Sequence, residues 1–258
     1  MAGEVKTDSR SIRAVRATAT AGAIAGAMAL VVVLVAGCAG PAERGADAPA
    51  AVPAGSAAPP SSVAAVPRGA RHYDIDAARS LLTIRVLRGG TLASVGHNHV
   101  IASHDLQGSI ERAPALQDSL VQLRFPVAAL TVDEPALRTQ AGADFAAEVP
   151  DSARDGTRRN LFGPALLDAA RFGTIELRAS RIGAEPGGAR MTMGVRVREV
   201  ESEFEAPVAI TTEGADLVAS GEVELRQSQL GLTPFSVMMG ALQVQDAMRL
   251  QFRVVARP

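Results

Sequence analysis

The stretch Met248-Arg249-Leu250-Gln251-Phe252-Arg253-Val254 decides the fold class of this chain. Apolar and polar side chains alternate along it, and a period of two is the pattern of a β-strand with one buried face. The alternation recurs in segments 82–86, 121–127, 175–180, 190–198, 204–210 and 217–226, and more weakly in 73–75 and 97–110. Strands with one dry face are typical of antiparallel sheets, which tend to close because closure removes exposed edges. The sequence therefore predicts an all-β domain, a closed antiparallel β-barrel of about eight strands.

Only the segment from Glu134 to Ala170 lacks this alternation. Ser152-Ala153-Arg154-Asp155 resembles a capping box with Asp in place of Glu, which indicates a helix start. The apolar group Leu166, Leu167, Ala169 and Ala170, which comes after Pro164, suits a further short helix. We therefore expect one or two short helices over one end of the barrel.

The N-terminus has the pattern of an export signal. Residues 17–37 are uncharged and end in Val35-Ala36-Gly37-Cys38. Four basic side chains precede them, namely Lys6, Arg10, Arg13 and Arg16. A cysteine after small residues resembles a bacterial lipobox, which implies that residues 1–38 are a lipoprotein signal peptide and that Cys38 carries the lipid. An uncleaved transmembrane anchor is the alternative, because about 20 apolar residues span a bilayer.

Both interpretations place the rest of the chain outside the cytoplasm, facing the periplasm and attached to a membrane at its N-terminus. Ala39 comes directly after the cysteine, where lipoproteins retained at the inner membrane often carry aspartate, and this favours the outer membrane. Residues 39–71 are rich in Ala, Pro, Gly and Ser, and such a composition predicts a disordered tether. Residues 72–258 then form one globular domain.

Charge and cysteine content exclude two classes of protein. The chain has 26 basic and 27 acidic residues, and removal of residues 1–38 leaves 22 basic against 25 acidic side chains. An acidic balance with no basic cluster does not fit nucleic-acid binding. Cys38 is the only cysteine, so a small scaffold held by intramolecular disulfides is excluded as well.

Several short segments carry a family resemblance by their order and spacing. They are Tyr73-Asp74-Ile75-Asp76 with Ser80 and Leu82-Thr83-Ile84-Arg85-Val86; His97–Ile110 with Gly108; Arg158-Arg159-Asn160-Leu161 with Leu166-Leu167-Asp168 and Phe172; Gln227-Ser228-Gln229-Leu230-Gly231-Leu232; and Asp246-Ala247-Met248-Arg249-Leu250. Together they resemble the YceI-like family of exported, lipocalin-like barrels. This resemblance implies a barrel over residues 72–258 that holds a long isoprenoid or fatty chain.

The composition of the barrel strands is compatible with such a ligand. The domain has no Trp, and small residues fall on inward positions at Ala179, Ala206, Ala219 and Gly221. Few large side chains are therefore available to fill the interior of the barrel. We expect the ligand to contact apolar and thioether side chains, namely Ile84, Val86, Phe125, Met191, Met193, Val195, Phe204, Leu225, Phe235, Met238, Met239 and Phe252. An isoprenoid, a quinone or a fatty-acid derivative fits this wall, and no cofactor is expected. A packed core with no cavity is the alternative.

The histidines provide a second hypothesis. His97 and His99 are two residues apart and share one face of a strand, and His104 lies close behind them. Zinc sites use three or four ligands, and His104 has the opposite parity, so we expect no metal there and favour local hydrogen bonds or contact with a polar ligand head. A metal-binding or catalytic barrel that uses His97 and His99 stays an alternative, as does a structural, partner-binding barrel. No recognisable nucleophile, phosphate-loop or metalloprotease motif is present, so we do not expect an enzyme.

Overall fold

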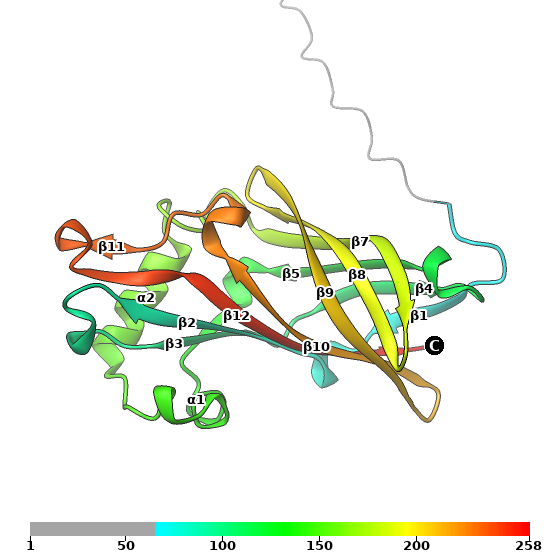
Figure 1. The fold of residues 1–258 in the computed structure, drawn as a ribbon, viewed down its shortest axis with the longest axis horizontal. Coiled ribbons are helices and arrows are strands. Elements are labelled where there is room, and N and C mark those ends of the chain that lie inside the picture. The colour runs from blue at the N-terminus through cyan, green and yellow to red at the C-terminus, as the bar shows by residue number, and fades with distance from the viewer. Residues whose placement is uncertain (1–64) are drawn as a thin grey trace, which may run out of the picture. The chain divides into compact units, whose positions relative to one another are not determined.

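The alternating segments form strands that pair edge to edge into a ring (Figure 1). The structure is a computed structural model, and it describes residues 65–258. The ring runs β1-β4-β5-β7-β8-β9-β10-β12 and closes where β12 pairs with β1. Its strands are β1 (Arg71–Ile75), β4 (Gln107–Arg112), β5 (Leu120–Pro126), β7 (Thr174–Glu185), β8 (Gly188–Val197), β9 (Val200–Glu213), β10 (Asp216–Arg226) and β12 (Leu242–Arg257). This confirms the predicted closed antiparallel barrel.

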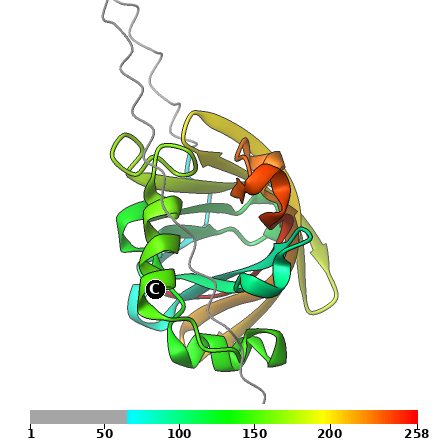
Figure 2. The same ribbon diagram turned by 90° about the vertical axis from the view of Figure 1, so that its left-hand side faces the viewer.

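Strand β12 is long enough to hold two neighbours on one edge. Its first part pairs with β2 (Leu81–Gly89), and its last residues pair with β1. Strand β2 continues the sheet into two further short strands, β3 (His99–Ser103) and β6 (Thr131–Val132). The two-residue strand β11 (Ser236–Val237) pairs with the start of β12. The sheet therefore extends beyond the ring at the end where the helices lie (Figures 1 and 2).

Two helices interrupt the strands, α1 (Pro135–Ala141) and α2 (Asp151–Phe162), as the sequence predicts. The predicted details are partly wrong. Pro150, not Ser152, is the N-cap of α2, and no side chain caps it. Residues 166–170 form turns instead of a helix. The helix ends at Gly163, Pro164 comes next, and Asp168 has a φ of 47°, which a helix does not accept.

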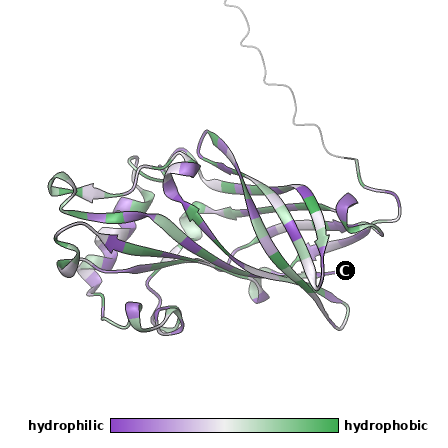
Figure 3. Ribbon diagram, viewed as in Figure 1, coloured by the Kyte–Doolittle hydropathy of each residue, from purple (hydrophilic) through white to green (hydrophobic). Residues whose placement is uncertain are grey.

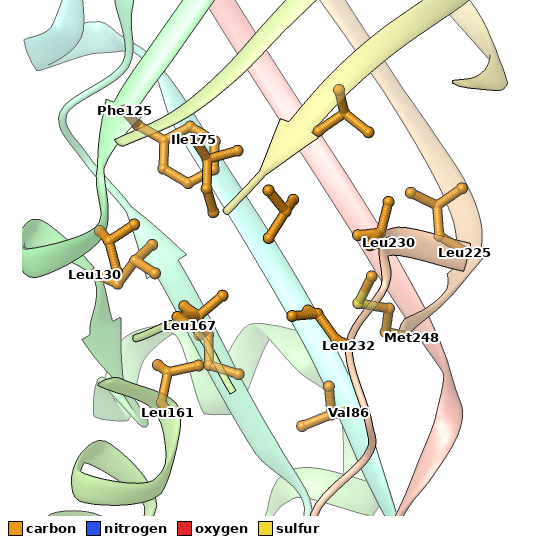
Figure 4. Close-up of a cluster of buried hydrophobic side chains, with 14 of the residues drawn as sticks. Val86, Phe125, Leu130, Leu161, Leu167, Ile175, Leu225, Leu230, Leu232 and Met248 are labelled. Atoms are coloured by element: carbon orange, nitrogen blue, oxygen red, sulfur yellow. The ribbon is translucent and has the colours of Figure 1, made fainter. Parts of the chain in front are cut away.

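Hydropathy alternates along the strands (Figure 3). Apolar side chains of the barrel strands line the interior of the ring. A buried cluster at the helix end contains Phe125 and Ile175 from the barrel and Leu161 and Leu167 from α2 and the turn after it (Figure 4). A second buried cluster at the far end includes Tyr73, Ile110 and Met191. Helix α2 and the turn after it thus pack against one end of the barrel interior, whereas Leu137 of α1 packs against β3 in a separate cluster.

Glycine is required at one position of the resemblance pattern. Gly108 in β4 has a φ of 130°, and a Cβ there would lie 2.0 Å from the carbonyl oxygen of Gln122. No other residue fits so close to the backbone of the neighbouring strand.

The signal peptide, Cys38 and most of the tether lie outside the described residues. Strand β1 begins at Arg71, one position before the predicted start of the domain. Within residues 65–258, no helix has the length and apolar character that a membrane-spanning segment needs.

Candidate ligand-binding cavity

The inward side chains of the ring leave a cavity of about 170 Å³. Its wall is built from alternate residues of the barrel strands, so the strand period that defines the fold also defines the cavity. The atoms that face the cavity are apolar. Charged Arg112 contributes only the aliphatic part of its side chain to the wall.

The cavity is long for its volume. Met191 and Val197 both line it from β8, and at about 3.3 Å per residue they lie about 20 Å apart along the strand. Pockets for drug-sized ligands have volumes of roughly 300–1,000 Å³, whereas an apolar cavity of about 150 Å³ stays dry and admits a small hydrocarbon. A narrow, dry tunnel therefore suits a slim hydrocarbon chain and not a bulky molecule.

The structure places most of the predicted ligand-contact residues on this wall. Of the predicted ligand-contact residues, those that line the cavity are Ile84, Phe125, Met191, Met193, Val195, Phe204, Leu225 and Phe252. Val86 is buried in the cluster at the helix end instead. Phe235, Met238 and Met239 lie outside the cavity in the segment around β11, and Met239 is fully exposed. Contact of any of these side chains with a ligand stays a prediction.

A second hollow of about 250 Å³ lies outside the ring, between α1 and the outer faces of β2 and β12. Its wall mixes apolar Leu137 and Val100 with polar Thr83 and with the basic Arg85 and Arg253. A hydrocarbon chain gains more free energy from a wholly apolar wall. The interior cavity is therefore the better candidate for a hydrophobic ligand.

The predicted histidine cluster lies beside the helices and forms hydrogen bonds with acidic residues. His99 Nδ1 lies 2.6 Å from Asp133 Oδ2, and His99 Nε2 lies 3.3 Å from the hydroxyl of Thr157 in α2. His104 Nε2 lies 2.9 Å from Glu134 Oε1. The rings of His97 and His99 are 6.3 Å apart, centre to centre.

Asp133 is the centre of this network. It is 1% exposed, and its Oδ1 accepts hydrogen bonds from Arg138 Nη1 at 2.7 Å and from the amide of Val100 at 3.0 Å. Burial alone raises the pKa of Asp133, but the hydrogen bonds from His99, Val100 and Arg138 outweigh it and hold the pKa below its ordinary value. The carboxylate therefore stays ionised and links β3 to α1.

The pKa of His97 shifts for related reasons. Burial lowers it most, and electrostatic interactions with His99, Arg138 and Arg88 lower it further. Among residues 65–258, no three His, Cys, Asp or Glu side chains lie close enough together to hold a metal ion. In this network the acidic and hydroxyl partners hold the ring of His99.

The roles of Asp133 and Arg138 could not be inferred from the sequence, which shows Asp133-Glu134 as an acidic pair of the kind that faces solvent. In the structure both side chains are buried. Arg138 is 8% exposed and donates to the carbonyls of Phe145 and Ala147, both at 2.8 Å. Asp133 and Arg138 are five residues apart, not the three or four that place two side chains on one helix face, and the sequence gives no sign that they are buried. Only the position of α1 on the outer face of β3 buries them.

A closed antiparallel barrel with a narrow apolar cavity is typical of the lipocalin-like class of proteins. No protein-family model matches the sequence, and no curated protein matches it. Among solved structures, BcnA of Burkholderia cenocepacia is 15% identical, with a TM-score of 0.51 over 70% of this chain and 99% of that chain. A YceI protein of Campylobacter jejuni is 9% identical, with a TM-score of 0.38 over 54% and 72% of the two chains. A mutant YceI protein is 11% identical, with a TM-score of 0.43 over 60% and 81%. At this identity the similarity to BcnA shows a shared fold.

Proposed function

We propose that this protein binds a long hydrophobic chain inside its barrel. An isoprenoid, a quinone or a fatty-acid derivative would fit the cavity. The observation that carries the proposal is the tunnel of about 170 Å³ with its apolar wall. Each methylene group that leaves water for such a wall contributes roughly 0.8 kcal/mol, so ten of them supply several kcal/mol.

The proposal includes export and attachment to a membrane. The uncharged run before Cys38 supports a lipoprotein signal, and Ala39 favours the outer membrane. A tethered barrel facing the periplasm could take up a chain at one membrane and keep it out of water. The proposal assigns binding, not catalysis, to the cavity because the atoms that face it are apolar.

The experiment compares two Ala-to-Phe variants of the full-length protein purified from its native membranes. Ala219 lines the cavity, and Ala219→Phe fills part of it with a ring. Ala209 is an exposed residue of the neighbouring strand β9, so Ala209→Phe is the matched control. An organic extract of each protein is analysed by mass spectrometry.

We expect a stoichiometric long-chain lipid in the wild type and in Ala209→Phe, and a severalfold loss in Ala219→Phe. Thermal unfolding of the three proteins shows whether each variant is folded. A wild-type extract with no lipid beyond that of an unrelated lipoprotein would contradict the proposal. So would equal lipid content in all three folded proteins.

A further inference from the structure

Two arginines stand at inward positions on neighbouring strands at the far end of the barrel. Arg71 of β1 lies directly opposite Arg112 of β4. Arg71 precedes Tyr73 by two positions and Arg112 comes two positions after Ile110, and both of these apolar neighbours are 6% exposed. Because side chains alternate across a strand, the arginines share the inward face with Tyr73 and Ile110. They form what we call the basic rim.

The basic rim adjoins the cavity at the end away from the helices. The aliphatic stem of Arg112 lines the cavity together with Leu116 and Ser119 from the connection between β4 and β5. The guanidinium of Arg112 donates to the carbonyl of Ala113, and that of Arg71 lies 5.4 Å from the centre of the Tyr73 ring. At this end of the apolar cavity, Arg112 is part of the wall, and the exposed Arg71 lies opposite it on the neighbouring strand.

The charges of the basic rim are not balanced within the described part of the chain. Like charges directly opposite each other in a sheet are destabilising. The next pair along the same strands shows the usual solution, since His72 lies opposite Glu111 with His72 Nδ1 2.6 Å from Glu111 Oε1. Among residues 65–258, no carboxylate lies within ion-pair distance of Arg71 or Arg112.

We propose that the basic rim binds the anionic head of the chain that the cavity holds. The ligand is then an amphiphile with a carboxylate or a phosphate group, its tail in the tunnel and its oxygens between Arg71 and Arg112. Arginine suits this role because its planar guanidinium pairs with either oxyanion through two parallel hydrogen bonds. This inference rests on the proposed function and adds the chemical class of the ligand.

The test compares three ligands with one tail and different heads: dodecanoate, dodecyl phosphate and dodecanol. Each is titrated by calorimetry, below its micelle concentration, into the delipidated full-length protein. The variants are Arg71→Gln, Arg112→Gln and the double variant. The control is Arg190→Gln, which removes an outward arginine paired with Glu185 at 2.9 Å near the hairpin that joins β7 and β8.

We expect at least one of the anionic ligands to bind the wild type roughly tenfold or more tightly than dodecanol, because hydrogen bonds to charged groups are the strong ones. The double variant loses this preference and keeps its affinity for dodecanol, while Arg190→Gln behaves as the wild type. The tighter of the two anions identifies the head group. The wild-type series tests the inference even if a variant does not fold.

Two other outcomes are distinguishable. Equal binding of all three ligands to the wild type overturns the basic rim as a head-group site but leaves the proposed function standing. An anion preference that survives in the folded double variant overturns it as well. Absence of binding for every ligand contradicts the proposed function, and the inference falls with it.

Discussion

At the scale of single residues, Asp133 shows how a charge is tolerated inside this protein. Burying a lone carboxylate is unfavourable unless other groups compensate it. Here the compensation comes from His99, Arg138 and the amide of Val100, which all donate to its two oxygens. The φ of Asp133 is 56°, a conformation that Asp and Asn accept more easily than other residues.

Asp133→Asn isolates the contribution of this charge, because Asn keeps the shape and tolerates the backbone conformation. We expect the variant to lose about 3 kcal/mol of unfolding free energy near neutral pH, since it breaks a buried ion pair. Urea unfolding monitored by circular dichroism measures the loss. Glu185→Gln, which breaks the exposed pair with Arg190, is the control and should change stability by less than about 1 kcal/mol.

We also expect the stability difference between the wild type and Asp133→Asn to depend on pH. The folded protein holds the pKa of Asp133 below its ordinary value of 3.8, so the stabilisation is present above that value and is lost as pH falls through the lower, folded pKa. The difference in stability between wild type and Asp133→Asn should therefore shrink at about pH 3. A difference that is the same near neutral pH and at about pH 3 would show that the charge is not the stabilising feature.

Some residues of the network could be found from the sequence and others could not. The histidines stand out because His97 and His99 are close together in a strand pattern. Asp133 and Arg138 belong to segments with a polar pattern, and only tertiary packing buries them. By contrast, Ser228 and Asp246 both belong to the family resemblance, and they meet in the structure, with Ser228 Oγ donating to Asp246 Oδ2 at 2.6 Å.

At the scale of elements, the strands were predictable because each has a wet and a dry face. The helical region was less predictable from the sequence. Residues 166–170 have helix-compatible side chains, but Gly163 and Pro164 end α2 before them, and local propensity does not determine the conformation of the chain beyond that proline. The short strands β6 and β11 have two residues each, too few to show any alternation.

The paired register of β9 and β10 ends part-way along the barrel, and Gly221 comes directly after its last pair. Their pairing runs from Asp216 and Glu213 to Ser220 and Ala209 and then stops, close to Pro207, which has no amide hydrogen to donate. A Cβ at Gly221 would lie 2.4 Å from the carbonyl oxygen of Pro207 and 2.7 Å from the ring of Phe252. The strands can approach this closely only because the side chain is absent.

Gly221→Ala should therefore destabilise the protein by about 1–3 kcal/mol, since backbone and not only a flexible side chain must move. The matched control is Gly183→Ala in β7, where the nearest atom, the carbonyl oxygen of Arg190, would be 3.6 Å from the new Cβ. We expect that control to change stability by no more than about 0.5 kcal/mol. Urea midpoints of the two variants provide the comparison, and similar midpoints would show that β9 and β10 can move apart freely.

At the scale of the whole molecule, the closed ring could be predicted from strand number and alternation, whereas the cavity could not. Alternation tells which side chains point inward but not whether they touch across the axis. The small side chains of Ala206 and Ala219 indicate space, and both line the cavity. The basic rim could not be recognised from the sequence, because it depends on the register that places Arg71 opposite Arg112.

The ring closes through a short joint, which sets the last prediction. Strands β1 and β12 pair only at Asp74 with Arg257 and at Ile75 with Ala256, supported by the bond from the amide of Asp76 to the carbonyl of Val255 at 2.8 Å. Ala256 is 0% exposed. Ala256→Asp places a carboxylate in this joint, so we expect β1 to detach before the strands on the opposite side of the ring separate.

Hydrogen exchange measures that order of opening. In Ala256→Asp, the amides of β1 and β4 should exchange at least about tenfold faster than in the wild type, because their protection depends on the closed joint. The amides of β7 and β8 should stay protected, since these strands pair along most of their length. Ala209→Asp, at an exposed position of β9, controls for the added charge. Equal acceleration in β1 and β8 would mean that the barrel opens as one cooperative unit and that the β1–β12 joint is not its weak point.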